Sequence, residues 1–248
     1  MATLSQLGSP SEASVLSERE SERRPMPPEV DVRVVPLTVH DGRLRVALVG
    51  GDAVWSLPCG VPRPGVSLDS EARRVVRGTA QLNERYLEQL FTRSIGDERS
   101  WKVIVSYLAL VDAEEQSAPD SRCSWFNTSE PATVSDEDRN SLEYAIVRLR
   151  AKIGYSTIAF HLLPPAFTLR ELQTAYEAIL GRSLDKRNFR RRVSAAELIE
   201  ATGSKRRDGS HRPAVLFRFR ADHDPATYLT PSWSDGNVGQ TGRDEGKG

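Results

Sequence analysis

The sequence predicts an α+β protein in two folded parts: a mixed β-sheet sandwiched by helices, then a smaller helical part that ends in a β-hairpin. Three observations support this prediction. β-Rich runs dominate the first part of the 248-residue chain, and two helical patterns interrupt them. Amphipathic helical patterns dominate the later part. The positive charge is concentrated in the later part. Residues 182–220 contain twelve Lys and Arg but only four Asp and Glu, a net charge of +8, whereas the net charge of the whole chain is zero.

The sheet part is expected over residues 31–155. β-Rich runs at Val32–Val39 and Arg43–Val49 flank the turn His40-Asp41-Gly42 and predict a hairpin. Pro36 predicts an edge position or a bulge for the first strand, because proline lacks the amide proton that a ladder needs. Further strands are expected at residues 55–57, 100–111 and 122–127, and helices at residues 68–82 and 136–153. Strands and helices in this order make a layered domain.

The two ends of the chain have a different composition. Residues 1–30 are rich in Ser, Glu and Pro and predict a disordered tail, and residues 222–248 predict a polar C-terminal tail. The N-terminus does not resemble a signal peptide, and no apolar run approaches the roughly 20 residues of a membrane helix. The two cysteines, Cys59 and Cys123, fit a reduced cytosol without excluding one disulfide. We therefore expect a cytoplasmic protein with no membrane partner.

The helical part is expected over residues 156–221, and its elements follow the order of a winged helix-turn-helix. Residues 158–163 predict a first helix. Thr168 and Glu171 have the spacing of a capping box at the start of the next helix, and Gly181 is placed to end it. Ser183 is placed to cap a third, very basic helix. Strand-like runs at residues 197–202 and 213–219 then enclose the basic turn GSKRRDGSHR, which suits a wing.

The charge of the third helix and the hairpin indicates a polyanionic partner. A charge run alone is more often a solvated face, but here it lies between a tight turn and a basic hairpin, which favours double-stranded operator DNA. Arg and Asn can read base edges in the major groove, and Lys and Arg also hold phosphates. The predicted DNA-binding residues are Thr168, Lys186, Arg187, Asn188, Arg190, Arg191, Lys205, Arg206 and Arg207.

Residues 60–82 have the spacing of a Nudix box: a Gly, five residues, a Glu, seven residues, then Arg-Glu-apolar-x-Glu-Glu-x-Gly-apolar. The chain resembles this box without a gap, and the matching residues are Gly60, Arg74, Val76 and Leu82. The glutamate positions hold Val66, Val75, Gly78 and Thr79. Magnesium in such a site is held by carboxylate oxygens, which these four side chains lack. We therefore expect a Nudix-like fold that is not an enzyme, with no catalytic residue, metal ligand or cofactor.

Two acidic residues lie near the glutamate positions of the box but out of register with them. Glu71 stands three residues before Arg74, and Asp69 is interpreted as the N-cap of the helix. They keep open an alternative function, a divergent Nudix hydrolase of nucleoside diphosphate derivatives with a relocated metal site. A further alternative is a winged helix that binds a protein or RNA.

The order of the two parts resembles the Nudix-related transcriptional regulators of the NrtR type. The segment LLPPAFTLRELQTAYEAILGRSLDKRNFRRRV is similar to the C-terminal signature of that family, and the resemblance covers residues 31–220. It implies a transcriptional repressor, acting as a homodimer, whose inactive Nudix domain senses ADP-ribose or a related metabolite of NAD metabolism. Residues 96–102 read GDERSWK where the family carries a proline-rich motif, which leaves the ligand open.

A nucleotide-type effector needs cations for its phosphates and an apolar surface for its base. The candidate ligand-binding residues are Arg43, Trp55, Arg63, Arg74, Arg77 and Arg99, although each alone is more simply a surface charge or a core aromatic. A homodimer needs an apolar surface outside the basic face. The helix expected over residues 136–153 offers one, with Leu142, Ala145, Ile146 and Leu149 at helical spacing.

Overall fold

The computed structural model describes residues 27–51, 54–97, 100–111, 123–207 and 213–220. Most of the two predicted tails therefore lies outside the described residues, and their disorder stays a prediction. The first strand begins at Glu29, inside the segment predicted as the N-terminal tail. None of the described helices is long and apolar enough to span a membrane.

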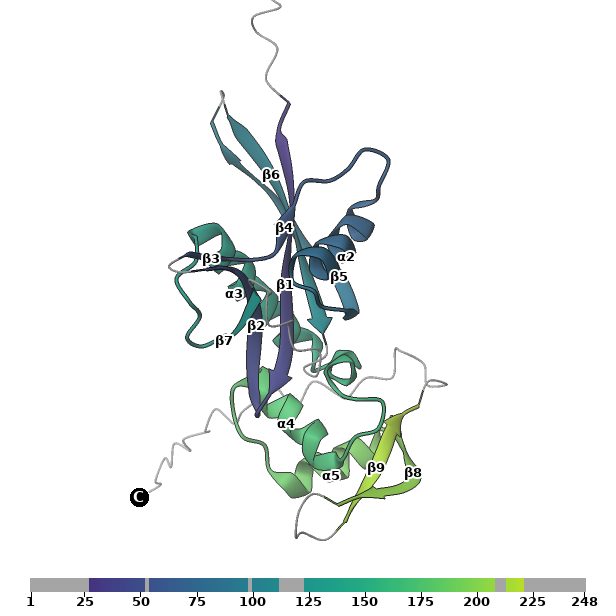
Figure 1. Cartoon of the computed structure of the whole chain (residues 1–248). Helices are drawn as coiled ribbons and strands as arrows, with labels where there is room; N and C mark the ends of the chain where they lie inside the picture. Colours follow the sequence, from purple (N-terminus) through teal and green to yellow (C-terminus); the bar gives the residue numbers. More distant parts are fainter. Residues whose placement is uncertain (1–26, 52–53, 98–99, 112–122, 208–212, 221–248) are drawn as a thin grey trace, which may run out of the picture.

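A seven-stranded mixed sheet forms the upper part of the molecule in Figure 1, in the order β3-β2-β1-β6-β5. β4 pairs with β1, and β7 pairs with β2. β1 and β6 run parallel, and the other pairs are antiparallel. The strands are β1 (Glu29–His40), β2 (Arg43–Gly51), β3 (Val54–Ser56), β4 (Cys59–Gly60), β5 (Glu84–Gly96), β6 (Trp101–Val111) and β7 (Cys123–Asn127). The predicted mixed sheet and its first hairpin are confirmed.

The position expected for Pro36 is wrong, because β1 lies in the middle of the sheet. On one side Pro36 pairs with Ala109 of β6. On the other side, pairing with β4 reaches Arg33 and pairing with β2 begins at Leu37. Pro36 therefore lies where β1 passes from one antiparallel neighbour to the next, and a central strand tolerates the proline there.

The sequence pattern does not predict β5, although this strand has 13 residues. β5 lies at the outer edge of the sheet, and its residues are exposed or half-buried, with none fully buried. Its pairing with β6 shifts register between Glu84 and Tyr86 and between Gln89 and Phe91. Such irregularities break the two-residue alternation by which a strand is recognised from sequence.

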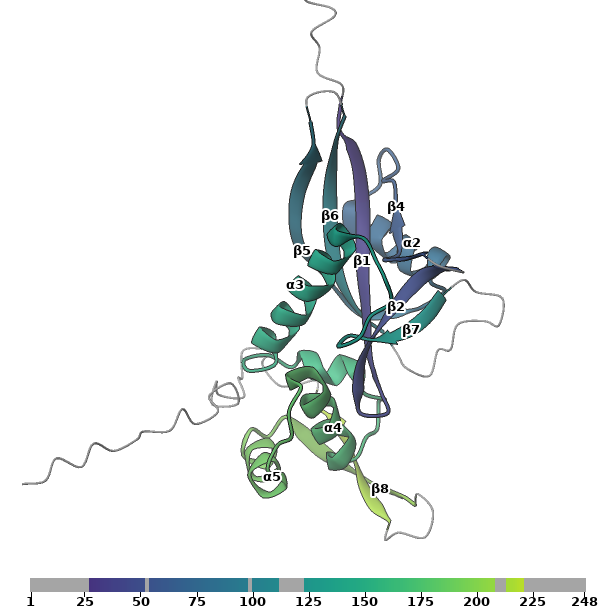
Figure 2. The same cartoon turned by 90° about the vertical axis from the view of Figure 1, so that its left-hand side faces the viewer.

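Two helices cover the two faces of the sheet, as Figure 2 shows: α2 (Leu68–Thr79) and α3 (Asp136–Lys152). Alternate residues of β1 supply the two cores. Val32 and Val34 pack in the core that includes α2, whereas Val35 and Leu37 pack in the core that includes α3. The N-cap of α2 is Ser67, whose side chain accepts a hydrogen bond from the Ser70 amide, so the cap predicted two residues later was misplaced.

The apolar stripe of α3 is used within the chain. Leu142, Ala145 and Leu149 are buried, and Ile146 packs against the same core. These side chains therefore do not supply the dimer surface that the sequence suggested. The opposite side of α3 exposes Tyr144 and Val147 instead.

The C-terminal part begins with η1 (Ile158–Leu162), a 3₁₀ helix. It continues with α4 (Leu169–Leu180), α5 (Lys186–Ala195) and the hairpin of β8 (Ile199–Arg206) and β9 (Ala214–Phe219). β8 is longer than predicted and takes up the start of the expected wing turn, while residues 208–212 lie outside the described residues. This is the predicted winged helix-turn-helix.

The two parts are in direct contact. The apolar core on the α3 side of the sheet continues into η1, α4 and α5. Figure 1 shows the β1–β2 turn reaching down to α4, and a Cβ added to Gly42 would lie 3.5 Å from Thr174 Cγ2. Arg150 of α3 donates from Nε to the Ile179 carbonyl of α4 at 2.9 Å. A change in the sheet part therefore has a short physical route to the helix-turn-helix.

Candidate functional site

α4 is fixed at both ends by the signals seen in the sequence. The Thr168 hydroxyl accepts a hydrogen bond from the Glu171 amide at 3.2 Å, and the Glu171 carboxylate accepts one from the Thr168 amide at 2.7 Å. Gly181 ends the helix in the left-handed region, at φ 68°. Thr168 is only 6% exposed, so its hydroxyl is committed to the capping box. This argues for a structural role of Thr168 and against a direct contact with DNA.

α5 presents its cations because its apolar residues hold it against α4. Phe189 and Val193 are buried, and the Phe189 ring packs on Tyr176 of α4 with the centroids 5.4 Å apart. Asp185, not Ser183, is the N-cap, and its side chain accepts a hydrogen bond from the Asn188 amide at 2.7 Å. The residues left exposed on α5 include Lys186, Arg187, Arg190 and Arg191.

The predicted DNA-binding residues of α5 differ in how free they are. Arg191 donates to the Asn188 side chain at 2.9 Å, so these two polar groups are paired on the helix surface. Within the described part of the chain, Lys186, Arg187 and Arg190 make no ion pair. The latter three side chains are therefore available to a partner.

The wing is attached to the start of α4 through an isolated β-bridge between Phe167, just before α4, and Phe217 of β9. Phe167 and Phe217 exchange two backbone hydrogen bonds, at 2.9 and 2.7 Å. Lys205 and Arg207 are exposed, whereas Arg206 forms an ion pair with Glu171 of the capping box. Of the three predicted wing contacts, Lys205 and Arg207 are therefore exposed, whereas Arg206 links the wing to α4.

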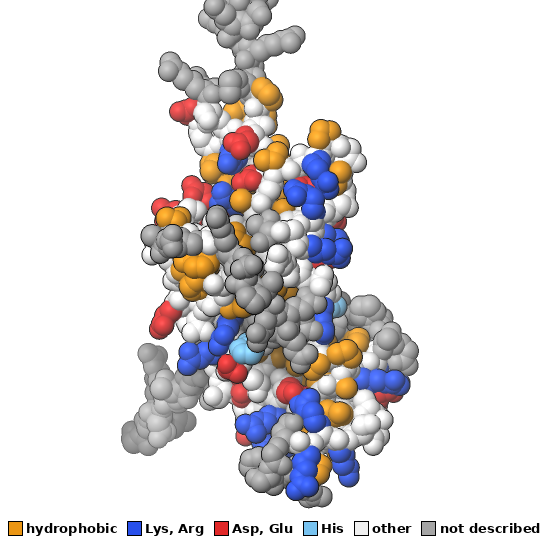
Figure 3. All heavy atoms as spheres, in the orientation of Figure 1, with side chains coloured by type: hydrophobic (Ala, Val, Ile, Leu, Met, Phe, Trp, Pro, Cys, Tyr) orange, Lys and Arg blue, Asp and Glu red, His pale blue; other side chains and the backbone are white. Residues whose placement is uncertain are grey.

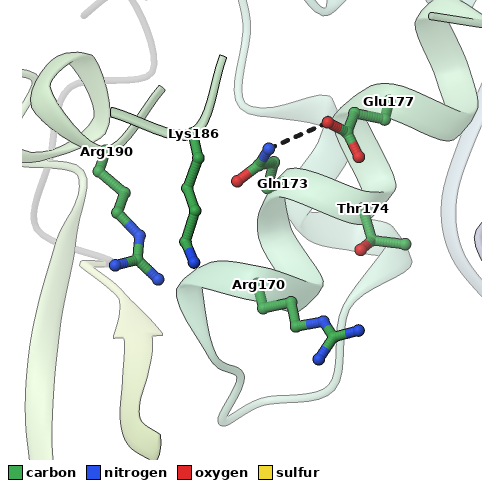
Figure 4. Close-up of a pocket in the computed structure, with 6 residues that line it drawn as sticks. All are labelled: Arg170, Gln173, Thr174, Glu177, Lys186 and Arg190. Atoms are coloured by element: carbon green, nitrogen blue, oxygen red, sulfur yellow. Dashed lines mark hydrogen bonds between the residues drawn. The ribbon is translucent and has the colours of Figure 1, made fainter. Parts of the chain in front are cut away.

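A cavity of about 330 Å³ lies between α4 and α5, as Figure 4 shows. Its lining includes Lys186 and Arg190 of α5 and also Arg170 of α4, which the sequence pattern did not indicate. Arg170 lies in an amphipathic helix whose sequence signals concern capping and the core, so only its position opposite α5 reveals it. Its lining is completed by Gln173, Thr174 and Glu177.

A second basic surface lies on α2, where Figure 3 shows Lys and Arg side chains gathered at the upper right. Glu71 of this helix has a fully buried side chain. Arg74 donates from Nε to its Oε1 at 2.7 Å, and Arg63 donates from Nε to its Oε2 at 3.3 Å. The hydrogen bond from Arg74 holds the pKa of Glu71 below its ordinary value.

Glu84, at the start of β5, repeats this arrangement. Its side chain is 1% exposed, and its Oε1 accepts from Arg73 Nη1 at 2.6 Å and from Arg77 Nη2 at 3.0 Å. Two buried carboxylates therefore hold four exposed guanidinium groups on one side of the sheet part. We name Arg63, Arg73, Arg74 and Arg77 the α2 arginine surface.

Three of the four Nudix glutamate positions, Val75, Gly78 and Thr79, lie on the same helix, and Val66 precedes it. Val75 is buried, and a Cβ on Gly60 would lie 2.9 Å from its Cγ2, so the pair is closely packed. A Cβ on Gly78 would meet no atom within 4 Å, so this position is open. Asp69 accepts a hydrogen bond from the Tyr107 hydroxyl at 2.8 Å. Among the described residues, no group of three or more His, Cys, Asp or Glu is arranged to hold a metal ion.

The other predicted effector residues are not close to α2. α2 packs on β1, β4 and β5, whereas Trp55 lies on the edge strand β3 and stacks edge-on against Phe126 at 4.9 Å. Arg43 lies beside the β1–β2 turn and lines a cavity of about 460 Å³ that α4 also borders. Arg99 lies outside the described residues. Of the predicted set, the structure brings together Arg63, Arg74 and Arg77, and it adds Arg73.

Comparison with known proteins identifies the C-terminal part and a relative that matches most of the chain. The NrtR DNA-binding winged helix domain matches residues 159–219. The ADPR responsive transcriptional repressor NtrR of Acinetobacter baylyi is 34% identical over 229 residues, which cover 84% of this chain and 88% of that protein.

Solved structures agree with this match. Shewanella oneidensis NrtR complexed with a 27mer DNA has a TM-score of 0.70 and 32% identity, and the alignment covers 80% of this chain and 96% of that one. A MutT/nudix family protein from Enterococcus faecalis has a TM-score of 0.63 at 20% identity, over 85% of this chain and 94% of that one, which supports the fold alone. The chain belongs to the NrtR family of Nudix-related transcriptional regulators.

Proposed function

We propose that this protein is a transcriptional repressor that binds operator DNA through α5 and the wing and responds to a nucleotide-type effector. The observation that carries the proposal is the exposed basic face of α5, where Lys186, Arg187 and Arg190 have no ion-pair partner in the described part of the chain. Unpaired cations on a helix that follows a tight turn suit the major groove and its phosphates. The relative solved with a 27mer DNA supports the same partner.

The effector proposed is ADP-ribose or a closely related nucleotide, because the Acinetobacter relative is an ADPR responsive repressor. The α2 arginine surface supports a site for its diphosphate. Planar guanidinium groups match phosphate oxygens in pairs, and here buried Glu71 and Glu84 already hold them in place. The arginines supply positive charge where a Nudix enzyme has a magnesium ion. Effector binding should therefore need no divalent metal.

Hydrolysis of the effector is not part of the proposed function. The two oxygens of Glu71, the acid nearest to the box, are bound by Arg74 and Arg63, so this carboxylate is poorly placed to hold a metal ion. We expect no turnover of ADP-ribose above a protein-free blank in magnesium or manganese. Metal-dependent turnover that disappears in Glu71→Gln would favour the alternative of a divergent hydrolase.

A homodimer is proposed as the active form, because one winged helix reads few base pairs and specific regulators commonly use two half-sites. The exposed face of α3 with Tyr144 and Val147 is the surface we propose for contact, since Val147 is 63% exposed. Half-site centres are expected roughly 34–36 Å apart, or a multiple of that. Light scattering of wild type and Val147→Glu tests this. A wild-type monomer that binds a single half-site with full affinity would contradict it.

Genome-wide mapping of bound DNA followed by fluorescence anisotropy tests the function as a whole. The expected result is a near-palindromic site bound far more tightly than a random duplex, with an affinity that changes when ADP-ribose is added. Equal affinity for the mapped and the random duplex would reject the proposed repressor.

A further inference from the structure

The lining of the cavity between α4 and α5 is positively charged. It includes Arg170, which is not among the predicted DNA-binding residues. In Figure 4, Lys186 and Arg190 extend from α5, whereas the Arg170 side chain leaves the start of α4 and points away from them. Lys186 and Arg190 are four residues apart, so they are neighbours on one side of their helix. The cavity volume is about 330 Å³, and the lining includes three cations and one carboxylate, Glu177.

Glu177 does not neutralise these cations by pairing with them. Its Oε1 accepts a hydrogen bond from the Gln173 side chain at 3.0 Å and another from the Leu184 amide at 2.8 Å. The carboxylate therefore fixes the turn between α4 and α5 and gives the cavity a defined wall. No ion pair of Arg170, Lys186 or Arg190 occurs among the described residues.

Two of the lining cations lie at the starts of their helices. Arg170 is the second residue of α4, and Lys186 is the first residue of α5. The carboxylates of Glu171 and Asp185 already cap these helix starts, so the positive charge for a further anion comes from the side chains of the lining cations. A phosphate at this place would meet side chains from both helices.

We propose that this cavity receives one phosphate of the DNA backbone beside Lys186 and Arg190, and that the Arg170 side chain turns toward this phosphate and clamps it when DNA binds. This inference rests on the proposed binding of operator DNA and adds a positioning role to α4. A phosphate held between the two helices fixes the depth and angle at which α5 enters the major groove. The two arginines of α5 then have different roles. Arg190 contacts a backbone phosphate, whereas Arg187, which does not line the cavity, contacts bases.

Salt titration of Arg170→Gln in the intact protein tests the contact. The slope of log K against log salt should become less steep by about 0.9, because one phosphate contact is lost. The loss of affinity should be the same for the mapped duplex and a random one. The matched control is Arg139→Gln, which removes one exposed arginine from α3, outside the winged helix, and should leave the slope unchanged.

Single methylphosphonate linkages in the duplex identify the phosphate. One neutral linkage should weaken wild type but leave the affinity of Arg170→Gln unchanged, and Arg170→Lys should recover part of the affinity. An unchanged salt slope, or the same linkage profile for wild type and Arg170→Gln, would overturn the clamp while DNA binding itself stands. Wild type that binds no duplex in a salt-dependent way would remove the clamp and the proposed function together.

Discussion

α2 and α5 are both short helices with exposed arginines, but the two sets of arginines are held differently. Those of α2 and its preceding loop are tied to Glu71 and Glu84, which are buried in the same domain. On α5, Arg187 and Arg190 have no such partner among the described residues. The same residue type thus forms a fixed surface in one region and a free one in the other.

The difference fits the two kinds of partner. A small ligand gains affinity when the groups that bind it are already in place, because less conformational freedom is lost on binding. A DNA duplex offers many phosphates, and long free side chains can adjust to them while counterions are released. We infer that buried carboxylates distinguish the effector surface from the DNA surface in this protein.

Removal of the core anchor of α5 should have the largest effect. Phe189→Ala deletes a fully buried ring that packs on Tyr176, so the free energy of unfolding should fall by about 3–5 kcal/mol. Chemical denaturation followed by circular dichroism measures this. DNA binding should be lost with it. Phe91→Ala, at a half-buried position on β5, is the control and should cost less. Unchanged stability of Phe189→Ala would show that α5 is not held by this contact.

Loss of a free arginine on α5 should come next. Arg187→Ala should weaken operator binding by about 1–3 kcal/mol and relax the sequence preference at one base pair, if this side chain reads a base edge. Anisotropy titrations on operator variants measure both effects, and Arg139→Ala provides the matched charge change outside the winged helix. ADP-ribose affinity should not change. Wild-type operator affinity with intact sequence preference would reject the proposed docking of α5.

Loss of a fixed arginine on α2 should weaken effector binding and leave operator binding unchanged. Arg74→Ala removes a guanidinium that Glu71 holds in place, so ADP-ribose should bind about tenfold more weakly, which corresponds to about 1.4 kcal/mol. Operator affinity without effector should stay at the wild-type value. Calorimetry with and without EDTA measures the affinity, which should not depend on metal. An effector that binds only in the presence of magnesium would contradict the arginine site.

The wing allows a smaller comparison within one hairpin. Lys205→Ala should weaken specific and random DNA alike by a few-fold, and its salt slope should be less steep by about 0.9. Arg206→Ala should mainly loosen the contact with Glu171 at the start of α4, and thus lower the unfolding temperature. Salt titrations and thermal unfolding of both variants separate these roles. If Arg206→Ala flattens the salt slope as Lys205→Ala does, the ion pair with Glu171 must open on DNA.

The smallest effect concerns acid stability of the α2 surface. The Arg74 hydrogen bond lowers the pKa of Glu71 from its ordinary value of 4.5, so the pair stabilises the folded protein fully above that value. The contribution is lost as the pH falls through the lowered pKa of the folded state. Glu71→Gln should therefore show a shallower loss of stability below pH 4.5 than wild type, as measured by unfolding at several pH values. Parallel curves would contradict the assignment.

Local sequence patterns determined much of this fold. The turn at residues 40–42, the capping box at Thr168 and the stop at Gly181 act within a few residues, so they can be recognised without knowledge of the fold. The spacing of the Nudix box and the basic run of α5 are also properties of the linear chain. These signals were sufficient for most of the element order, with β4 and β5 missed, and for the position of the exposed basic helix α5.

Tertiary structure alone decided which of these charged residues are free. Glu84 meets Arg73 and Arg77 only because β5, whose irregular pairing hides it in the sequence, returns beside α2. Arg206 of the wing hairpin pairs with Glu171, which lies 35 residues earlier in the chain. Arg170 comes to line one cavity with Lys186 and Arg190 only because α4 and α5 lie side by side in the fold. Such pairings depend on distances across the folded chain, and no local pattern of residues records those distances.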